Sequence, residues 1–136
     1  MSINVAEHLN PNVQEQRNEI YNFVVDFYSR VRKDEELGPI FNNKIGDHWD
    51  AHFQTLTDFW MTVLLGIHSY KGNPFLAHHQ TPGIENRHFD IWLAIFAESA
   101  NQMLEKSLAE IAIEKSVRIA GSLRQGLFFR ASKTAP

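Results

Sequence analysis

Apolar residues recur at steps of three and four along most of this chain, and this spacing constrains the fold more than any other feature of the sequence. Between residues 13 and 32, one such stripe consists of Ile20, Phe23, Val24, Phe27, Tyr28 and Val31. Because an α-helix brings positions three and four apart onto one face, the stripe predicts an amphipathic helix. No alternating run is long enough to suggest a strand, so we predict an all-α domain.

The same spacing predicts three further long helices. The first is expected from an N-cap at Asp47 to Gly66. The second is expected from about Glu85 to Leu104. The third begins with a capping-box pattern at Ser107.

Shorter elements are expected between the long helices. Gly38 and Pro39 break the first stripe, and the proline suits the first position of a short helical turn that carries residues 40 and 41. Residues 66–73 have the glycine-rich composition of a loop. A short helix is expected between the prolines at 74 and 82, because proline at the first helical position gives up an N–H that has no partner there.

The composition limits the class of protein. A length of 136 residues suits one domain, 1–136, with a core at about 13–130 and short flexible ends. The net charge of -3 comes from 13 basic and 16 acidic residues that form no block, which argues against nucleic acid as a partner. The absence of cysteine excludes disulfides, thiolate metal sites and covalent haem attachment, and it fits a reducing cytoplasm.

The longest apolar run is too short to span a bilayer and the start does not resemble a signal peptide, so we expect no membrane anchor and no export.

Three residues on inward-facing stripes combine an apolar body with a polar tip: Tyr28, His52 and Trp92. A buried polar tip without a hydrogen-bond partner costs about 1–3 kcal/mol, so each tip needs a partner. A diatomic ligand on haem iron would serve all three, since a hydrogen bond to a charged acceptor contributes about 1.5–3 kcal/mol. For any single tip, a bond to a backbone carbonyl is the simpler explanation.

Two adjacent histidines, His78 and His79, stand in the segment GNPFLAHHQTPG. A proximal haem ligand must offer a neutral ring nitrogen to iron while its other N–H is held, and a short, positioned helix can present such an imidazole. The two side chains point about 100° apart on a helix, so only one of them can face a pocket. Both also fit the surface at a helix C-terminus, where the helix dipole favours imidazolium.

The chain contains, in this order, FYSRVRKDEELGPIFNNKIGDHWDAH, DFWMTVLLG, SYKGNPFLAHH and HFDIWLAIF. These stretches include LGPIF, a Trp-x-x-His at 49–52, YKGNP and a Phe-x-x-Trp-Leu at 89–93, each of which is weak alone. Together they resemble a group III truncated haemoglobin, from about Phe23 to Phe128. The resemblance implies a truncated globin-like, two-over-two helical sandwich around non-covalent haem b.

The resemblance also implies roles for particular residues. His78 lies four residues beyond the proline of the YKGNP segment, which is the position of the proximal iron ligand in the family and selects His78 over His79. The distal cage around the ligand would consist of Tyr28, His52 and Trp92. The residues expected to pack around the porphyrin are Phe41, Leu56 and Trp60.

The expected function is binding of oxygen and other small ligands at haem iron, among them carbon monoxide, nitric oxide, cyanide and peroxide. Because the resemblance implies very tight oxygen holding, it favours redox chemistry on oxygen, peroxide or nitric oxide over oxygen transport. Peroxidase-like activity is one form that this chemistry could take. It would require a reductase that the sequence does not identify.

Two other interpretations follow from the residues alone. His48 and His52 are four apart, and Glu85-x-x-His88 is one half of a pattern used twice in di-iron carboxylate bundles, so a non-haem metal site is one alternative. The second copy of the Glu-x-x-His pattern is missing. The other alternative is a cofactor-free helical interaction module, in which the polar tips would be hydrogen-bond donors of the core.

Overall fold

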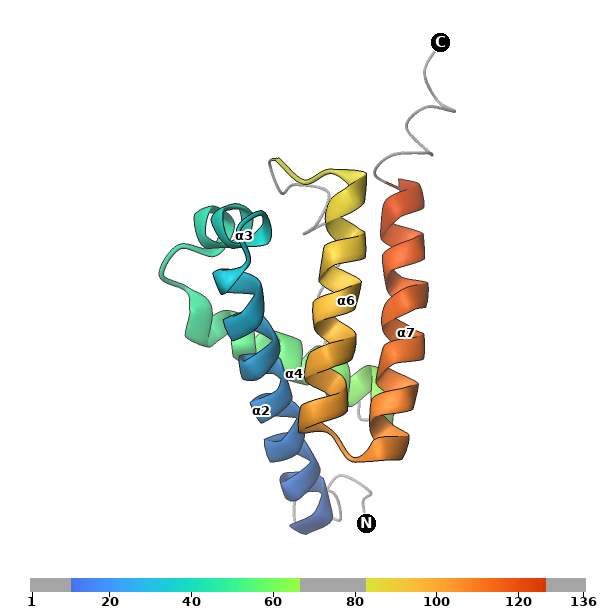
Figure 1. Ribbon diagram of the computed structural model, residues 1–136. Helices are drawn as coiled ribbons and strands as arrows, with labels where there is room; N and C mark the ends of the chain where they lie inside the picture. Colours follow the sequence, from blue (N-terminus) through green and yellow to red (C-terminus); the bar gives the residue numbers. More distant parts are fainter. Residues whose placement is uncertain (1–10, 67–82, 127–136) are drawn as a thin grey trace.

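The computed structural model describes residues 11–66 and 83–126, which form a helical bundle without a strand in those ranges (Figure 1). The helices are α2 (Pro11–Lys33), α3 (Leu37–Ile45), α4 (Trp49–Leu65), α6 (Asn86–Met103) and α7 (Lys106–Arg124). The prediction of an all-α fold is confirmed.

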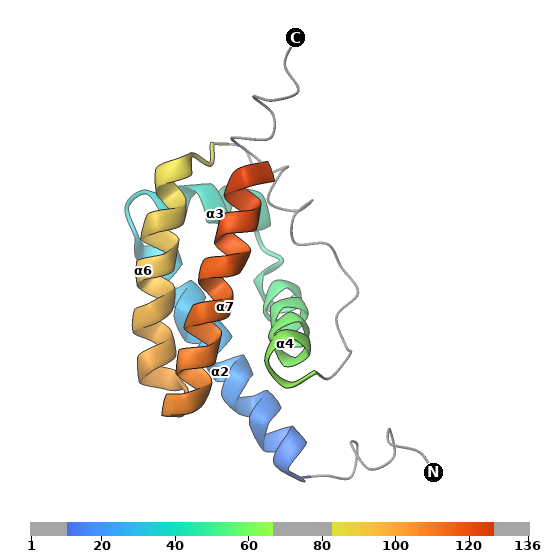
Figure 2. The same ribbon diagram turned by 90° about the vertical axis from the view of Figure 1, so that its right-hand side faces the viewer.

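The long helices pack as two pairs. Helices α6 and α7 lie side by side and antiparallel, and α2 crosses α4 in the other pair (Figure 1 and Figure 2). Contacts of α2 with α6 and of α4 with α7 bring the two pairs face to face, while α3 packs against α2 and α6. This arrangement is the expected two-over-two sandwich.

The predicted stripe of α2 forms the centre of the core. Phe23 of this helix is fully buried and meets Phe96 of α6 edge to face, with ring centroids 5.1 Å apart. Trp60 of α4 packs on Phe96 as well, also at 5.1 Å. The side chain of Phe96 therefore joins three helices.

Polar contacts fix α2 to the neighbouring helices on both sides. Asp26 accepts hydrogen bonds from the buried Ser99 of α6 at 2.6 Å and from Arg30 at 2.8 Å. Near the other end of α2, Arg17 pairs with Asp58 of α4 at 2.8 Å. These bonds hold α2 in place relative to both helices that face the centre of the bundle.

Several predicted helix boundaries are confirmed. Helix α6 lies between Glu85 as its N-cap and Leu104 as its C-cap. Helix α4 ends at Gly66, whose φ of 72° lies in the left-handed region that glycine adopts without strain.

The start of α4 differs from the prediction by one residue. The helix begins after His48 rather than after Asp47. Asp47 lies in a turn closed by the His48 N–H and the Ile45 carbonyl at 3.1 Å, so its carboxylate comes too early in the chain to cap the helix.

The start of α7 also differs, because a neighbouring carboxylate caps the helix. Glu105 accepts the backbone N–H groups of Ser107 at 3.0 Å and of Leu108 at 3.4 Å. Ser107 is therefore inside the first turn, and the predicted capping box that starts at this residue is wrong.

Helix α3 is longer than the short turn that was predicted, with nine residues. The backbone N–H groups of Glu36 and Leu37 donate to the Asp34 carboxylate at 3.0 and 2.9 Å, which fixes the connection from α2. Gly38 lets the two helices approach closely, since a Cβ at this position would lie 2.5 Å from the Arg32 carbonyl oxygen.

The remaining expectations fall on other parts of the chain. The short helix predicted between the prolines at 74 and 82 and the flexible end predicted at the C-terminus lie outside the described residues. Among the helices that the structure describes, none combines the length and the apolar character that crossing a membrane requires.

Candidate functional site

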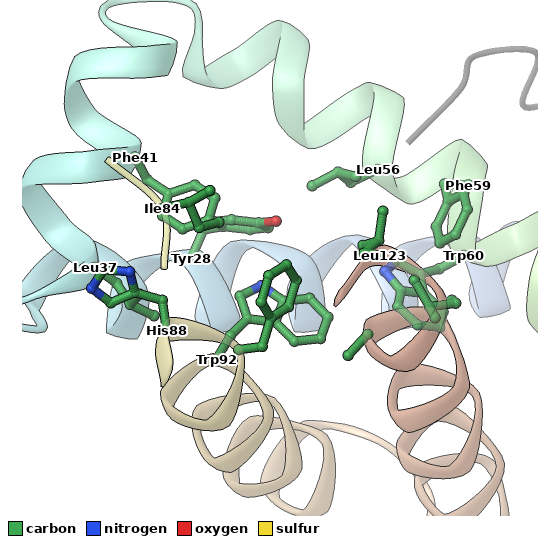
Figure 3. A pocket seen from close by; sticks show the side chains of 13 residues that line it. Tyr28, Leu37, Phe41, Leu56, Phe59, Trp60, Ile84, His88, Trp92 and Leu123 are labelled. Atoms are coloured by element: carbon green, nitrogen blue, oxygen red, sulfur yellow. The ribbon is translucent and has the colours of Figure 1, made fainter. Parts of the chain in front are cut away.

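A cavity lies between the two helix pairs, where side chains of α2, α3 and α4 face those of α6 and α7 (Figure 3). The empty space among the lining side chains, including the part that is open to solvent, is about 610 Å³. The lining residues are Tyr28, Leu37, Phe41, Leu56, Phe59, Trp60, Ile84, His88, Phe89, Trp92, Ile119, Ala120 and Leu123. Such a wall, apolar with a few polar tips, suits a large apolar ligand that carries a small polar group.

Tyr28 places a hydroxyl in the cavity (Figure 3). The residue is 5% exposed, and its ring packs against Phe27 and Phe41 with centroids 4.7 and 6.0 Å away. Burial raises the pKa of Tyr28 well above the ordinary tyrosine value, and hydrogen bonding from the nearby Trp92 indole opposes this rise without overcoming it. The hydroxyl therefore keeps its proton at neutral pH and is available as a donor.

Trp92 contributes an indole N–H from the opposite helix pair. Its ring stacks on Phe96 and meets Phe27 edge to face, both with centroids 5.3 Å away. The N–H lies near the Tyr28 hydroxyl, but it is buried and forms no hydrogen bond of normal geometry within the described part of the chain. A buried donor in this state costs about 1–3 kcal/mol, which an acceptor bound in the cavity would recover.

His52 lies behind Tyr28 rather than on the cavity wall. The imidazole is half-buried and packs edge to face on Tyr28 and on Trp49, with centroids 5.1 and 5.6 Å away. It is absent from the residues that line the cavity, whereas Tyr28 and Trp92 are among them. The structure thus brings the polar groups of Tyr28 and Trp92 to the cavity. The third predicted residue, His52, contacts Tyr28 instead.

All three residues expected to surround a porphyrin, namely Phe41, Leu56 and Trp60, line the cavity. Four other lining residues have only the helical spacing that is typical of a packed core: Phe59, Phe89, Ile119 and Leu123. A helical stripe shows which side chains point inward, but it cannot separate those that pack on a neighbour from those that border a void. Leu37 and Ile84, next to helix ends, carry no comparable signal in the sequence.

Glu85 and His88 form a helix cap rather than half of a metal site. The Glu85 backbone N–H donates to His88 Nδ1 at 2.8 Å, and the Glu85 side chain accepts the His88 backbone N–H. The other ring nitrogen, Nε2, lies 3.6 Å from Glu36 Oε1. The first nitrogen already serves as an acceptor for the helix terminus, so this motif does not present the free imidazole that a metal requires.

The second part of the non-haem alternative, the pair His48 and His52, is likewise not arranged as a metal site. The side chain of His48 is 84% exposed and lies near the carbonyl oxygen of Ile45, at 3.3 Å. No group of three or more His, Asp or Glu side chains within residues 11–66 and 83–126 is arranged to hold a metal ion. The choice between His78 and His79 as an iron ligand stays a prediction, because both lie outside the described residues.

A two-over-two helical sandwich that encloses an apolar cavity with protein donors on its wall has the architecture of a truncated globin. Consistent with this class, residues 13–124 match the sequence model of the family described as bacterial-like globin. The chain is 36% identical over 105 residues to the group 3 truncated hemoglobin ctb of Campylobacter jejuni, an alignment that covers 75% of this chain and 83% of the relative.

A solved structure agrees with the sequence match. The crystal structure of the group III truncated hemoglobin from Campylobacter jejuni matches with a TM-score of 0.77 at 34% identity, covering 82% of this chain and 91% of that chain. The chain therefore belongs to the bacterial-like globin family and, within it, to the group III truncated haemoglobins. As a globin, it binds small gaseous ligands through haem.

The described residues fit that cofactor. The wall is formed mainly by aromatic and aliphatic side chains from all five described helices, as a porphyrin ring requires. The indole N–H of Trp92 and the protonated hydroxyl of Tyr28 supply donors for a small polar ligand.

Proposed function

We propose that this protein holds haem b without a covalent link and performs redox chemistry on oxygen, peroxide or nitric oxide rather than oxygen transport. The observation that carries the proposal is the buried Trp92 N–H, which forms no hydrogen bond of normal geometry with the described residues although it lies at a cavity. A neighbouring donor, the Tyr28 hydroxyl, retains its proton and lines the same cavity. Two donors in an apolar wall favour an occupant with a polar, electron-rich end.

The proposed cofactor contacts come from the wall and from one histidine. Phe41, Leu56 and Trp60 would pack on the porphyrin, and His78 would be the proximal ligand. When bound, haem supplies an iron centre that binds small ligands and exchanges electrons. Cyanide and carbon monoxide are expected to bind alongside oxygen, peroxide and nitric oxide.

The donors argue against rapid delivery of oxygen. In the proposed cage, Tyr28 and Trp92 hold the ligand through hydrogen bonds, and His52, the third predicted member, packs against Tyr28. A hydrogen bond to a charged acceptor contributes about 1.5–3 kcal/mol, so each donor would slow ligand release by roughly ten- to a hundredfold. A protein that releases oxygen so slowly is better suited to transforming the ligand than to carrying it.

The same side chains would support the chemistry. Because burial raises the pKa of Tyr28, its hydroxyl donates a hydrogen bond without giving up its proton to the ligand. Fixed donors stabilise developing negative charge most effectively where water is excluded, and the apolar lining from α4 and α7 provides that exclusion. Turnover also needs electrons, so we infer a reductase as a partner, with the cytoplasm as the expected compartment.

An absorption spectrum of the purified chain, recorded oxidised, reduced and with carbon monoxide, tests the cofactor. We expect a Soret band that shifts with each state. A preparation from haem-sufficient cells without any Soret band would contradict the proposal and leave the cofactor-free interaction module.

The role of the unpartnered donor is tested separately by the rate of oxygen dissociation. Trp92→Phe should speed dissociation by about tenfold or more, from the loss of one charge-assisted bond. Trp49→Phe is the matched control, because it removes another buried indole N–H that has no hydrogen-bond partner among the described residues, at a position that does not line the cavity. Equal rates in the two variants would remove Trp92 from the cage.

A further inference from the structure

His88 borders the cavity from the first turn of α6, one helical turn before Trp92 (Figure 3). Only 4% of this side chain is exposed. Nδ1 accepts the Glu85 backbone N–H at 2.8 Å. Since a ring nitrogen that accepts a hydrogen bond carries no proton, the proton of the neutral ring is on Nε2, which faces Glu36 Oε1 at 3.6 Å.

The reciprocal bond makes this contact part of the helix terminus. The Glu85 side chain accepts the His88 backbone N–H, so the two residues satisfy donors on both sides of the first turn. Phe89 is in the same turn and also lines the cavity. The cap therefore holds two wall residues in place.

Charged groups surround the imidazole on the side away from the cavity. Glu36, at the start of α3, pairs with Arg87, and Arg87 also reaches Glu85 at 3.3 Å. From α7, Arg124 anchors the same end of α6 through Asp90 at 2.8 Å. On the cavity side, the titratable lining group from the other helix pair is the hydroxyl of Tyr28, which stays neutral.

We propose that His88 is a positioning residue whose protonation releases the first turn of α6 and opens this end of the cavity wall. A second proton can bind only at Nδ1, and an imidazolium ring has two donors and no acceptor. The Glu85 backbone N–H would then lose its acceptor and face the N–H at His88 Nδ1. The charged ring would instead be drawn toward the Glu36 carboxylate.

The consequence is a cavity whose accessibility depends on pH. Histidine side chains in general change charge within about pH 5–8, so the proposed loosening of the wall at His88 and Phe89 is sought over this range. This inference rests on the proposed function for its ligand, because access to the cavity matters only if a ligand binds there. The cap itself can be tested without the ligand.

The first test measures the association of carbon monoxide after flash photolysis of the holoprotein between pH 5 and pH 8. We expect the rate to be about two- to tenfold higher at the acidic end, the effect of losing one helix cap. His88→Gln should abolish this pH dependence and keep the slow rate, because glutamine at this capping-box position supplies an acceptor that does not titrate.

A matched variant controls for the same substitution at an exposed histidine. His48→Gln changes a residue that is 84% exposed, and it should keep the parent's pH profile. A flat profile in the parent, or an unchanged profile in His88→Gln, would overturn the proposal.

The second test uses nitrogen NMR of the full-length chain and does not depend on ligand binding. In the diamagnetic ferrous carbon monoxide form, or in the chain as purified if it binds no haem, Nδ1 of His88 should be the unprotonated nitrogen at neutral pH. The Glu85 amide signal should shift as the pH is lowered from 8 to 5. A proton on Nδ1 at neutral pH, or a Glu85 amide that does not respond, would refute the proposed cap even where haem binding is established. Conversely, a chain that lacks a Soret band but shows both signals would contradict the proposed function alone.

Discussion

At the residue scale, the burial of a polar tip is not sufficient to mark the site. The indole N–H of Trp49 is buried and without a hydrogen-bond partner among the described residues, as that of Trp92 is. Trp49 nevertheless does not line the cavity, and its ring is covered by the Arg32 guanidinium at 4.4 Å. Trp92 is distinguished by facing a void next to a second donor, Tyr28.

Replacement of that second donor gives a direct prediction. Tyr28→Phe keeps the buried ring and removes the hydroxyl, so it should speed oxygen dissociation by about tenfold or more. Stopped-flow displacement of oxygen by carbon monoxide measures this rate. Tyr21→Phe is the control, because it makes the same chemical change on the same helix at a residue that does not line the cavity. If both variants release oxygen at the parent's rate, Tyr28 does not hold the ligand.

The assignment of the iron ligand is a second prediction at this scale. His78→Ala should greatly weaken haem retention, since it removes the proposed bond between protein and iron, while His79→Ala should leave retention nearly intact. The measurement is the rate of haem transfer to an excess of a haem-free acceptor globin. The opposite result would assign the ligand to His79.

At the scale of helices, the sequence predicted the elements better than their ends. The stripes identified all four long helices, because burial of one face requires apolar residues at helical spacing. The first residue of a helix depends on which side chain reaches the free backbone N–H groups of its first turn. A shift of one residue along the chain is enough to change that side chain. The Glu105 carboxylate caps α7 where Ser107 was expected, and Asp47 lies one residue too early to cap α4.

The same limit applies to the site. Inward-facing stripes correctly pointed Tyr28 and Trp92 toward the interior, but the cavity depends on how helices from both pairs meet. His52 has helical spacing with wall residues of α4 and still lies outside the cavity lining. His88 was considered for its motif with Glu85, and only the three-dimensional contacts identify that motif as a cap.

The close contact between α2 and α3 gives a prediction about stability. Gly38→Ala would place a Cβ 2.5 Å from the Arg32 carbonyl oxygen, which belongs to the backbone and cannot turn away. We expect a loss of about 1–3 kcal/mol in the free energy of unfolding, as is usual for overpacking. Chemical denaturation measures it.

The control for this change is another helical glycine. Gly121 of α7 has nothing within 4 Å of an added Cβ, so Gly121→Ala should raise the free energy of unfolding by about 0.4–1 kcal/mol. Equal effects at the two positions would show that the contact between α2 and α3 does not restrict the side chain.

At the scale of the whole molecule, the cavity separates the two helix pairs over part of their interface, so the bound cofactor is expected to complete the packing. A ligand that binds only the folded state stabilises it by mass action. Extraction of haem should therefore lower the midpoint of thermal unfolding followed by far-UV circular dichroism, and added haem should restore it. An unchanged midpoint would argue that the cavity does not hold the cofactor.

Helix α2 contacts α3, α4 and α6, and it carries Tyr28 at its buried face. The hydroxyl donor of the site thus stands on a helix that packs against three others, as the Trp92 donor on α6 does. Natural or engineered diversification of gas selectivity in this chain is accordingly expected to proceed through substitutions on α4 and α7, each of which packs mainly on two helices, so that exchange of a wall residue disturbs fewer neighbours.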